Sequence, residues 1–80
     1  MRRRRRTEDV GTFTITSRGI EASASTPGAA ISKAQTLATR VQLTGELEEG
    51  DVQSLYVRRL GGDPIARVDV KQDVIETYAY

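Results

Sequence analysis

The chain of 80 residues contains no cysteine, no histidine and no tryptophan. Without thiolates and imidazoles it can form neither a disulfide framework nor a Cys/His zinc site, and it cannot use these groups in catalysis. Aromatic residues are few, with one phenylalanine and three tyrosines. No apolar run approaches the roughly 18 residues that a membrane-spanning helix needs. The hydrophobic fraction of 38% is low but sufficient for one small folded body.

Charge is distributed unevenly along the chain. The 12 basic and 11 acidic residues give a net charge of +1, but five of the basic residues are Arg2–Arg6. Without this run the remainder has 7 basic against 11 acidic residues and a charge of −4. We predict a flexible Arg-rich arm over residues 1–9, because adjacent like charges repel and have nothing to pack against, and a single domain over residues 10–80.

The basic start resembles the first part of a signal peptide, but the resemblance ends at once. Thr7-Glu8-Asp9 follows the arginines, and no apolar segment of about 7–15 residues comes after it. We therefore expect a cytoplasmic protein.

Two segments near the start alternate between apolar and polar residues. Phe13 and Ile15 alternate with threonines, which predicts a strand, and Arg18-Gly19 offers a turn. Residues 20–25 alternate more weakly, because alanine and serine have low strand propensity. The pair predicts a β-hairpin, with one extended strand as the alternative.

Thr26-Pro27 is a typical helix start, with an N-cap residue followed by a proline at the first helical position. The apolar residues that follow recur at helical spacing and form one stripe; they are Ala30, Ile31, Ala34, Leu37, Ala38 and Val41. Gly45 can end the helix. As an alternative, residues 41–44 leave the helix as a strand.

The second half predicts another hairpin. Residues 52–60 fit a strand better than a helix, because Gly61-Gly62-Asp63 follows and residues 65–70 alternate clearly after Pro64. Residues 74–80 either extend that strand or form a short last one. The predicted class is α+β, with a four-stranded, mostly antiparallel sheet in the order β-β-α-β-β and one helix packed on one face.

The arginine run is the strongest functional signal, because guanidinium groups pair readily with phosphates. Engagement of about five phosphates would give a log–log salt slope near −4 to −5. The alternatives are a solvated tail, a tail that folds back on the acidic body, and a tail that binds an acidic protein. A membrane is disfavoured because no amphipathic segment accompanies the charges. If residues 52–60 form a strand, Tyr56 and Arg58 share a side of the sheet and add a small surface for base stacking. The alternative is that these arginines form ordinary ion pairs on the sheet surface; the candidate pairs join Arg58, Arg59 or Arg67 to Asp63, Asp69 or Glu21. The candidate nucleic-acid-binding residues are Arg2, Arg3, Arg4, Arg5, Arg6, Tyr56, Arg58 and Arg67.

Other chemistry has little support in the sequence. The acidic residues of 46–51 lack the spacing of a calcium loop and are typical of a solvated loop. No phosphate-binding glycine motif and no nucleophile motif occurs, so we expect no enzyme, no cofactor and no metal. Tyr78 and Tyr80 are expected to pack in the core or at a dimer seam rather than to form a base-stacking platform.

The leading prediction is a small non-catalytic module that binds DNA or RNA. The alternative is a protein-binding adaptor or inhibitor, of a kind that phages encode, which engages a host or partner protein through its acidic body or sheet face. A homodimer is compatible with both, since so small a core gains from further burial of apolar area.

Overall fold

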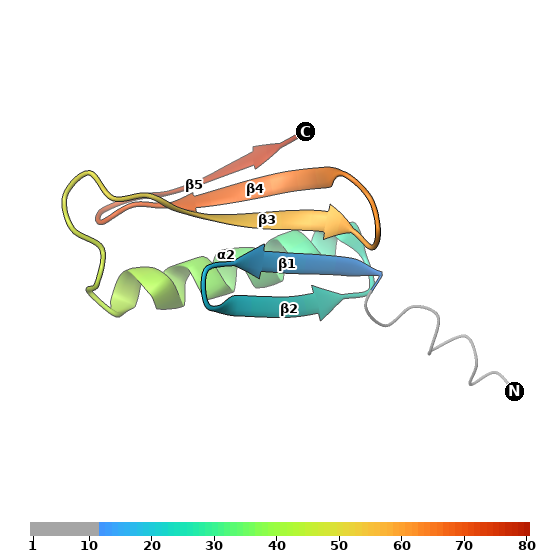
Figure 1. Cartoon of the computed structure of the whole chain (residues 1–80), viewed down its shortest axis with the longest axis horizontal. Coiled ribbons are helices and arrows are strands. Elements are labelled where there is room, and N and C mark those ends of the chain that lie inside the picture. The colour runs from blue at the N-terminus through green and yellow to red at the C-terminus, as the bar shows by residue number, and fades with distance from the viewer. Residues whose placement is uncertain (1–11) are drawn as a thin grey trace, which may run out of the picture.

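The computed structural model describes residues 12–80 (Figure 1). The predicted arm with Arg2–Arg6 and the predicted domain boundary after residue 9 lie outside these residues. The elements in chain order are β1 (Phe13–Ser17), β2 (Ile20–Ala24), α2 (Pro27–Leu43), β3 (Gln53–Arg59), β4 (Pro64–Val70) and β5 (Ile75–Ala79). The strands form one antiparallel sheet in the order β2-β1-β3-β4-β5, and α2 lies across one face of it. For residues 12–80, the predicted α+β class with one helix is confirmed.

The prediction of four strands is wrong, because the sheet that residues 12–80 form has five. The chain reverses after β4 in a tight turn, in which the Lys71 N–H donates to the Val74 carbonyl at 2.9 Å. This turn pairs Val70 with Ile75 and makes residues 75–79 a separate edge strand. Its central residues, Gln72 and Asp73, include neither glycine nor proline, so the sequence gives only a weak sign of it.

The helix forms where the sequence predicts it. The Thr26 side chain accepts the Ala29 N–H, Pro27 occupies the first turn, and Gly45 follows the end with a φ of 74°. The alternative of a strand over residues 41–44 is wrong, since the helix continues to Leu43. Within the described part of the chain, no helix combines the length and apolar character needed to cross a bilayer.

Three alanines bring the helix close to the sheet. Ala30, Ala34 and Ala38 are completely buried and lie one turn apart along the helix. Small side chains at these positions let the backbone of α2 approach the sheet closely. The facing strand residues are large; the fully buried ones are Ile15, Leu55, Val57, Val68 and Val70. The core of residues 12–80 therefore lies between α2 and one face of the sheet.

Candidate nucleic-acid interface

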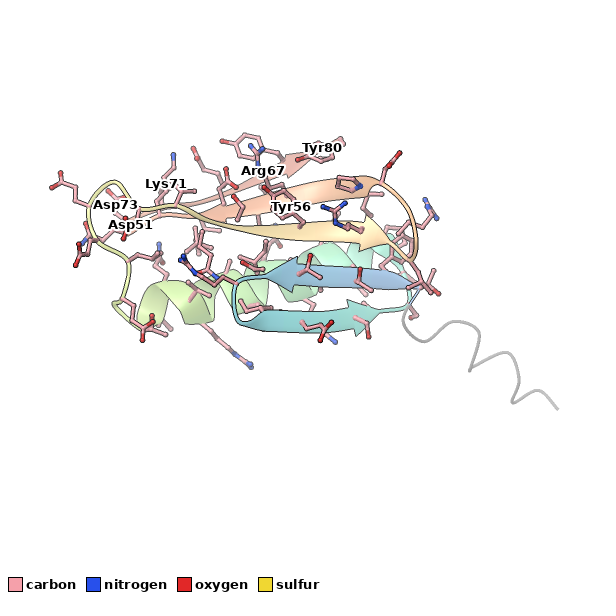
Figure 2. All side chains as sticks on the ribbon, viewed as in Figure 1. Asp51, Tyr56, Arg67, Lys71, Asp73 and Tyr80 are labelled. Atoms are coloured by element: carbon pink, nitrogen blue, oxygen red, sulfur yellow. The ribbon has the colours of Figure 1, made fainter. Side chains whose placement is uncertain are left out.

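The sheet has a second face, which α2 does not cover, and we call it the open face. Strand residues alternate between the two faces, so the neighbours of the buried core residues point to this side. The register places Tyr56 of β3 opposite Arg67 of β4, and Arg67 opposite Tyr78 of β5. Because neighbouring strands lie about 4.8 Å apart, the two tyrosines are about 10 Å apart, with the arginine between them. Figure 2 shows Tyr56 and Arg67 on these strands, with Tyr80 at the end of the chain.

Each of the two arginines on the open face lies against a tyrosine ring. The Arg67 Cζ atom is 4.8 Å from the centre of the Tyr78 ring, and the Arg58 Cζ atom is 5.6 Å from that of Tyr56. Such cation–π contacts contribute about 0.5–1 kcal/mol each at exposed sites. The contacts place Arg58 and Tyr56 on one side, as predicted. Arg59 instead lies over the ring of Phe13, at 5.1 Å.

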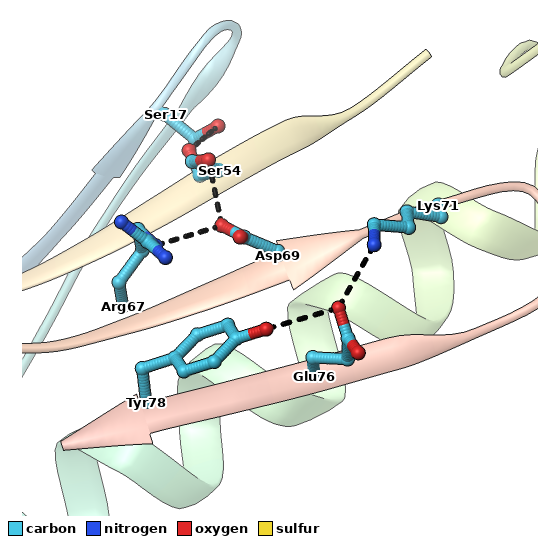
Figure 3. A network of polar contacts seen from close by, with 7 residues as sticks. All are labelled: Ser17, Ser54, Arg67, Asp69, Lys71, Glu76 and Tyr78. Carbon is cyan, nitrogen blue, oxygen red and sulfur yellow. Dashed lines mark hydrogen bonds and ion pairs between the residues drawn. The ribbon is translucent and has the colours of Figure 1, made fainter. Parts of the chain in front are cut away.

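Asp69 ties Arg67 to the sheet. The Arg67 Nε atom lies 3.0 Å from Asp69 Oδ1, and Ser54 Oγ donates to the same oxygen at 2.7 Å (Figure 3). Asp69 is 9% exposed, so its charge is largely removed from water. The Nε–H does not point at the carboxylate in hydrogen-bond geometry, so the contact is an ion pair rather than a directed bond. This is the surface charge pairing that the sequence offered as the alternative to a nucleic-acid contact.

A second network holds Tyr78 at the outer strand. Lys71 Nζ lies 3.0 Å from Glu76 Oε1, and the Tyr78 hydroxyl donates to the same oxygen at 3.1 Å (Figure 3). The hydrogen bond from Lys71 lowers the pKa of Glu76, and the same bond raises the pKa of Lys71. The hydrogen bond to Glu76 also raises the pKa of Tyr78. All three groups therefore remain in their usual charge states near neutral pH.

The open face carries balanced charge. The cations Arg58, Arg67 and Lys71 share it with three carboxylates, which belong to Glu21, Asp69 and Glu76. Two of the cations are paired with two of the carboxylates. The face by itself therefore offers rings and hydrogen-bonding groups, and little net attraction for an anion.

The acidic loop after the helix is organised by its own backbone. Asp51 Oδ2 accepts the Glu48 N–H at 3.0 Å, and the Glu48 carbonyl accepts the Asp51 N–H at 2.9 Å. Leu47 is 8% exposed and anchors the loop in the core. In residues 12–80 no cluster of three or more carboxylates is arranged to hold a metal ion.

Three predicted site residues come together on the open face: Tyr56, Arg58 and Arg67. Arg2–Arg6 lie outside the described residues. Tyr78 and Tyr80 are not among the predicted site residues, although their spacing of two residues marks them as sharing a face. They are 40% and 64% exposed, so neither packs in the core of this domain.

Comparison of the chain with models of protein families, with curated proteins and with solved structures gives no match. A function must therefore follow from the chemistry of the side chains themselves.

Proposed function

We propose that this protein is a small non-catalytic module that binds nucleic acid, with bases on the open face and phosphates on the Arg2–Arg6 arm. The observation that supports it best is the row Tyr56, Arg67 and Tyr78 across β3, β4 and β5. Exposed aromatic rings on a sheet provide stacking platforms for bases, each worth about 1–3 kcal/mol per base. Tyr80 extends the platform along β5.

The two parts of the proposed surface make different contributions. The open face has balanced charge, so it contributes stacking and hydrogen bonds that depend weakly on salt. The arginine run supplies attraction to phosphates, and this term falls steeply as salt is added. Arg58 is the cation of the face that forms no ion pair with any residue of 12–80, so it is the one best placed to meet a phosphate.

The test is a titration of a fluorescent single strand of about 16 nucleotides, followed by anisotropy at several salt concentrations. A chain that begins at Thr7 should show a log–log salt slope that is shallower by about 3.5, because each of about five lost phosphate contacts contributes about 0.7 on a single strand. The variant Tyr56→Thr/Tyr78→Thr keeps β-branched residues in the strands but removes both rings, and it should bind at least about tenfold more weakly with the slope unchanged.

The matched control for the face compares two arginines. Arg58→Ala and Arg40→Ala make the same change in net charge, but Arg40 is an exposed residue near the end of α2. Weaker binding by Arg58→Ala, with unchanged binding by Arg40→Ala, supports the open face as the binding surface. Equal binding by both variants and by the tyrosine variant contradicts it, as does the absence of binding by the full chain.

One observation favours the alternative of a protein-binding adaptor or inhibitor. The balanced charge of the open face suits a protein partner as well as a base. A stoichiometric partner protein that survives nuclease treatment, and that Tyr56→Thr/Tyr78→Thr fails to bind, would support this alternative.

A further inference from the structure

Within residues 12–80, no strand pairs with the outer edge of β5, and this edge exposes its backbone groups. The Lys71 N–H donates to Val74 and the Tyr80 N–H donates to Ile65, both across the β4–β5 pair. Antiparallel residue pairs alternate between bonded and non-bonded, so Glu76 and Tyr78 also direct their backbone groups toward β4. The N–H and C=O groups of Ile75, Thr77 and Ala79 therefore point away from the sheet.

The other edge of the sheet, β2, is protected. The Leu60 N–H donates to the Thr12 carbonyl, so residues 12, 14 and 16 direct their backbone groups toward β3, and residues 13, 15 and 17 direct theirs toward β2. In β2, the partners of 13, 15 and 17 are residues 24, 22 and 20, so the backbone groups of Glu21 and Ser23 point outward from the sheet. Lys33 Nζ donates to the outward Ser23 carbonyl at 2.7 Å. Charged side chains at a sheet edge, such as Lys33 and Glu21 here, are devices by which proteins prevent pairing with a further strand.

No such device occurs on β5. The strand contains no lysine, proline or bulge, and its one charged residue, Glu76, is paired with Lys71. Exposed large apolar side chains also gather at this strand, since Val74, Tyr78 and Tyr80 are 40%, 40% and 64% exposed. An unprotected edge with apolar rings beside it is a template for a further strand.

We propose that β5 pairs antiparallel with β5 of a second copy of this chain, so that two sheets join into one. Centred on Thr77, the pairing brings the outward groups of Ile75 in each copy to those of Ala79 in the other. All outward groups of the edge then find partners. Side chains also match, because Glu76 of one copy lies opposite Tyr78 of the second copy and not opposite another carboxylate.

The pairing is independent of any nucleic acid, and it is tested by sedimentation equilibrium of the full chain from micromolar to millimolar concentration. Thr77→Pro removes the outward N–H at the centre of the seam, at a position where proline is tolerated in a free edge strand. Thr77→Val is its control, because both variants lose the hydrogen bond that Thr77 Oγ1 accepts from Gln35, and only valine keeps the N–H. We expect dimers in the wild type and in Thr77→Val, and a dissociation constant that is at least about tenfold higher in Thr77→Pro.

A monomer at every concentration overturns the proposal, and so does a Thr77→Pro variant that dimerises like the wild type. If Thr77→Pro does not fold, amide hydrogen exchange of the wild type decides. The amides of Ile75, Thr77 and Ala79 should gain protection as the concentration rises, whereas that of Tyr78 is protected throughout. Exchange at these three amides that does not change with concentration overturns the pairing.

Discussion

Replacement of Arg67 tests whether the ion pair on the open face stabilises the fold. Arg67→Met keeps the apolar stem but leaves the Asp69 carboxylate, which is 9% exposed, without its cation. A buried charged group that loses a partner costs about 1–3 kcal/mol. The Arg67 side chain is 34% exposed, so solvent screening favours the lower half of that range, about 1–2 kcal/mol. Loss of the contact with Tyr78 adds about 0.5–1 kcal/mol.

The assay is urea denaturation, which gives the free energy of unfolding, with the m-value as a check on two-state behaviour. We expect Arg67→Met to lose about 1.5–3 kcal/mol of unfolding free energy, which for a domain of this size lowers the Tm by roughly 6–24 °C. Arg58→Met is the matched control, because it removes a guanidinium over a tyrosine ring that has no ion pair within residues 12–80. It should lose less than about 1 kcal/mol.

A double-mutant cycle isolates the pair itself. Asp69→Asn keeps an oxygen for the Ser54 hydroxyl but has no charge for Arg67 to balance. If the ion pair matters, Arg67→Met/Asp69→Asn is less destabilised than the sum of the single variants by about 1–2 kcal/mol. Additive losses of unfolding free energy in the double variant, or equal losses in Arg67→Met and Arg58→Met, would refute a stabilising role of the ion pair. Arg67 would then contribute to ligand binding rather than to the stability of the fold.

Three further perturbations test the helix and the outer strand. Ala34→Leu should lose about 1–3 kcal/mol of unfolding free energy by overpacking the contact between helix and sheet, while Ala29→Leu on the exposed side should change it little. Thr26→Ala should cost about 0.5–2 kcal/mol through the lost N-cap, and Thr26→Ser, which keeps the hydroxyl, should not. The lowered pKa of Glu76 means that its carboxylate stabilises the fold above the ordinary value of 4.5, and that this contribution is lost as the pH falls through the lowered pKa. Glu76→Gln should therefore flatten the dependence of Tm on pH in that acidic range.

The sequence predicts the hairpins and the helix well because periodicity and turn residues agree there. Gly19 and Gly61 adopt positive φ angles of 75° and 72° in the turns that the alternation leads up to. The fifth strand is different, since the turn at 71–74 contains no glycine or proline that would mark a reversal of the chain. The sequence pattern alone therefore does not distinguish a separate fifth strand from an extension of β4.

The candidate site is only partly predictable, for a reason that lies in the register. Alternation predicts that Tyr56 and Arg58 share a side, because both belong to one strand. Which residues of β4 and β5 come beside them depends on the pairing across strands, which alternation within one strand does not fix. The meeting of Arg67 with Tyr78 could therefore be found only from the folded sheet.

The two proposals together make one further prediction. If β5 edges join, the open faces of two copies form a continuous surface with Tyr78 of each copy beside the seam. A long single strand that contacts both faces then gains from a high effective concentration, whereas a strand that covers one face does not. Thr77→Pro, which alters no ring or cation of the open face, should weaken binding of a strand of about 30 nucleotides by at least about tenfold and leave binding of one of about 6 nucleotides unchanged. Equal effects on both lengths, measured by anisotropy against Thr77→Val, would mean that the seam and the binding surface are not linked.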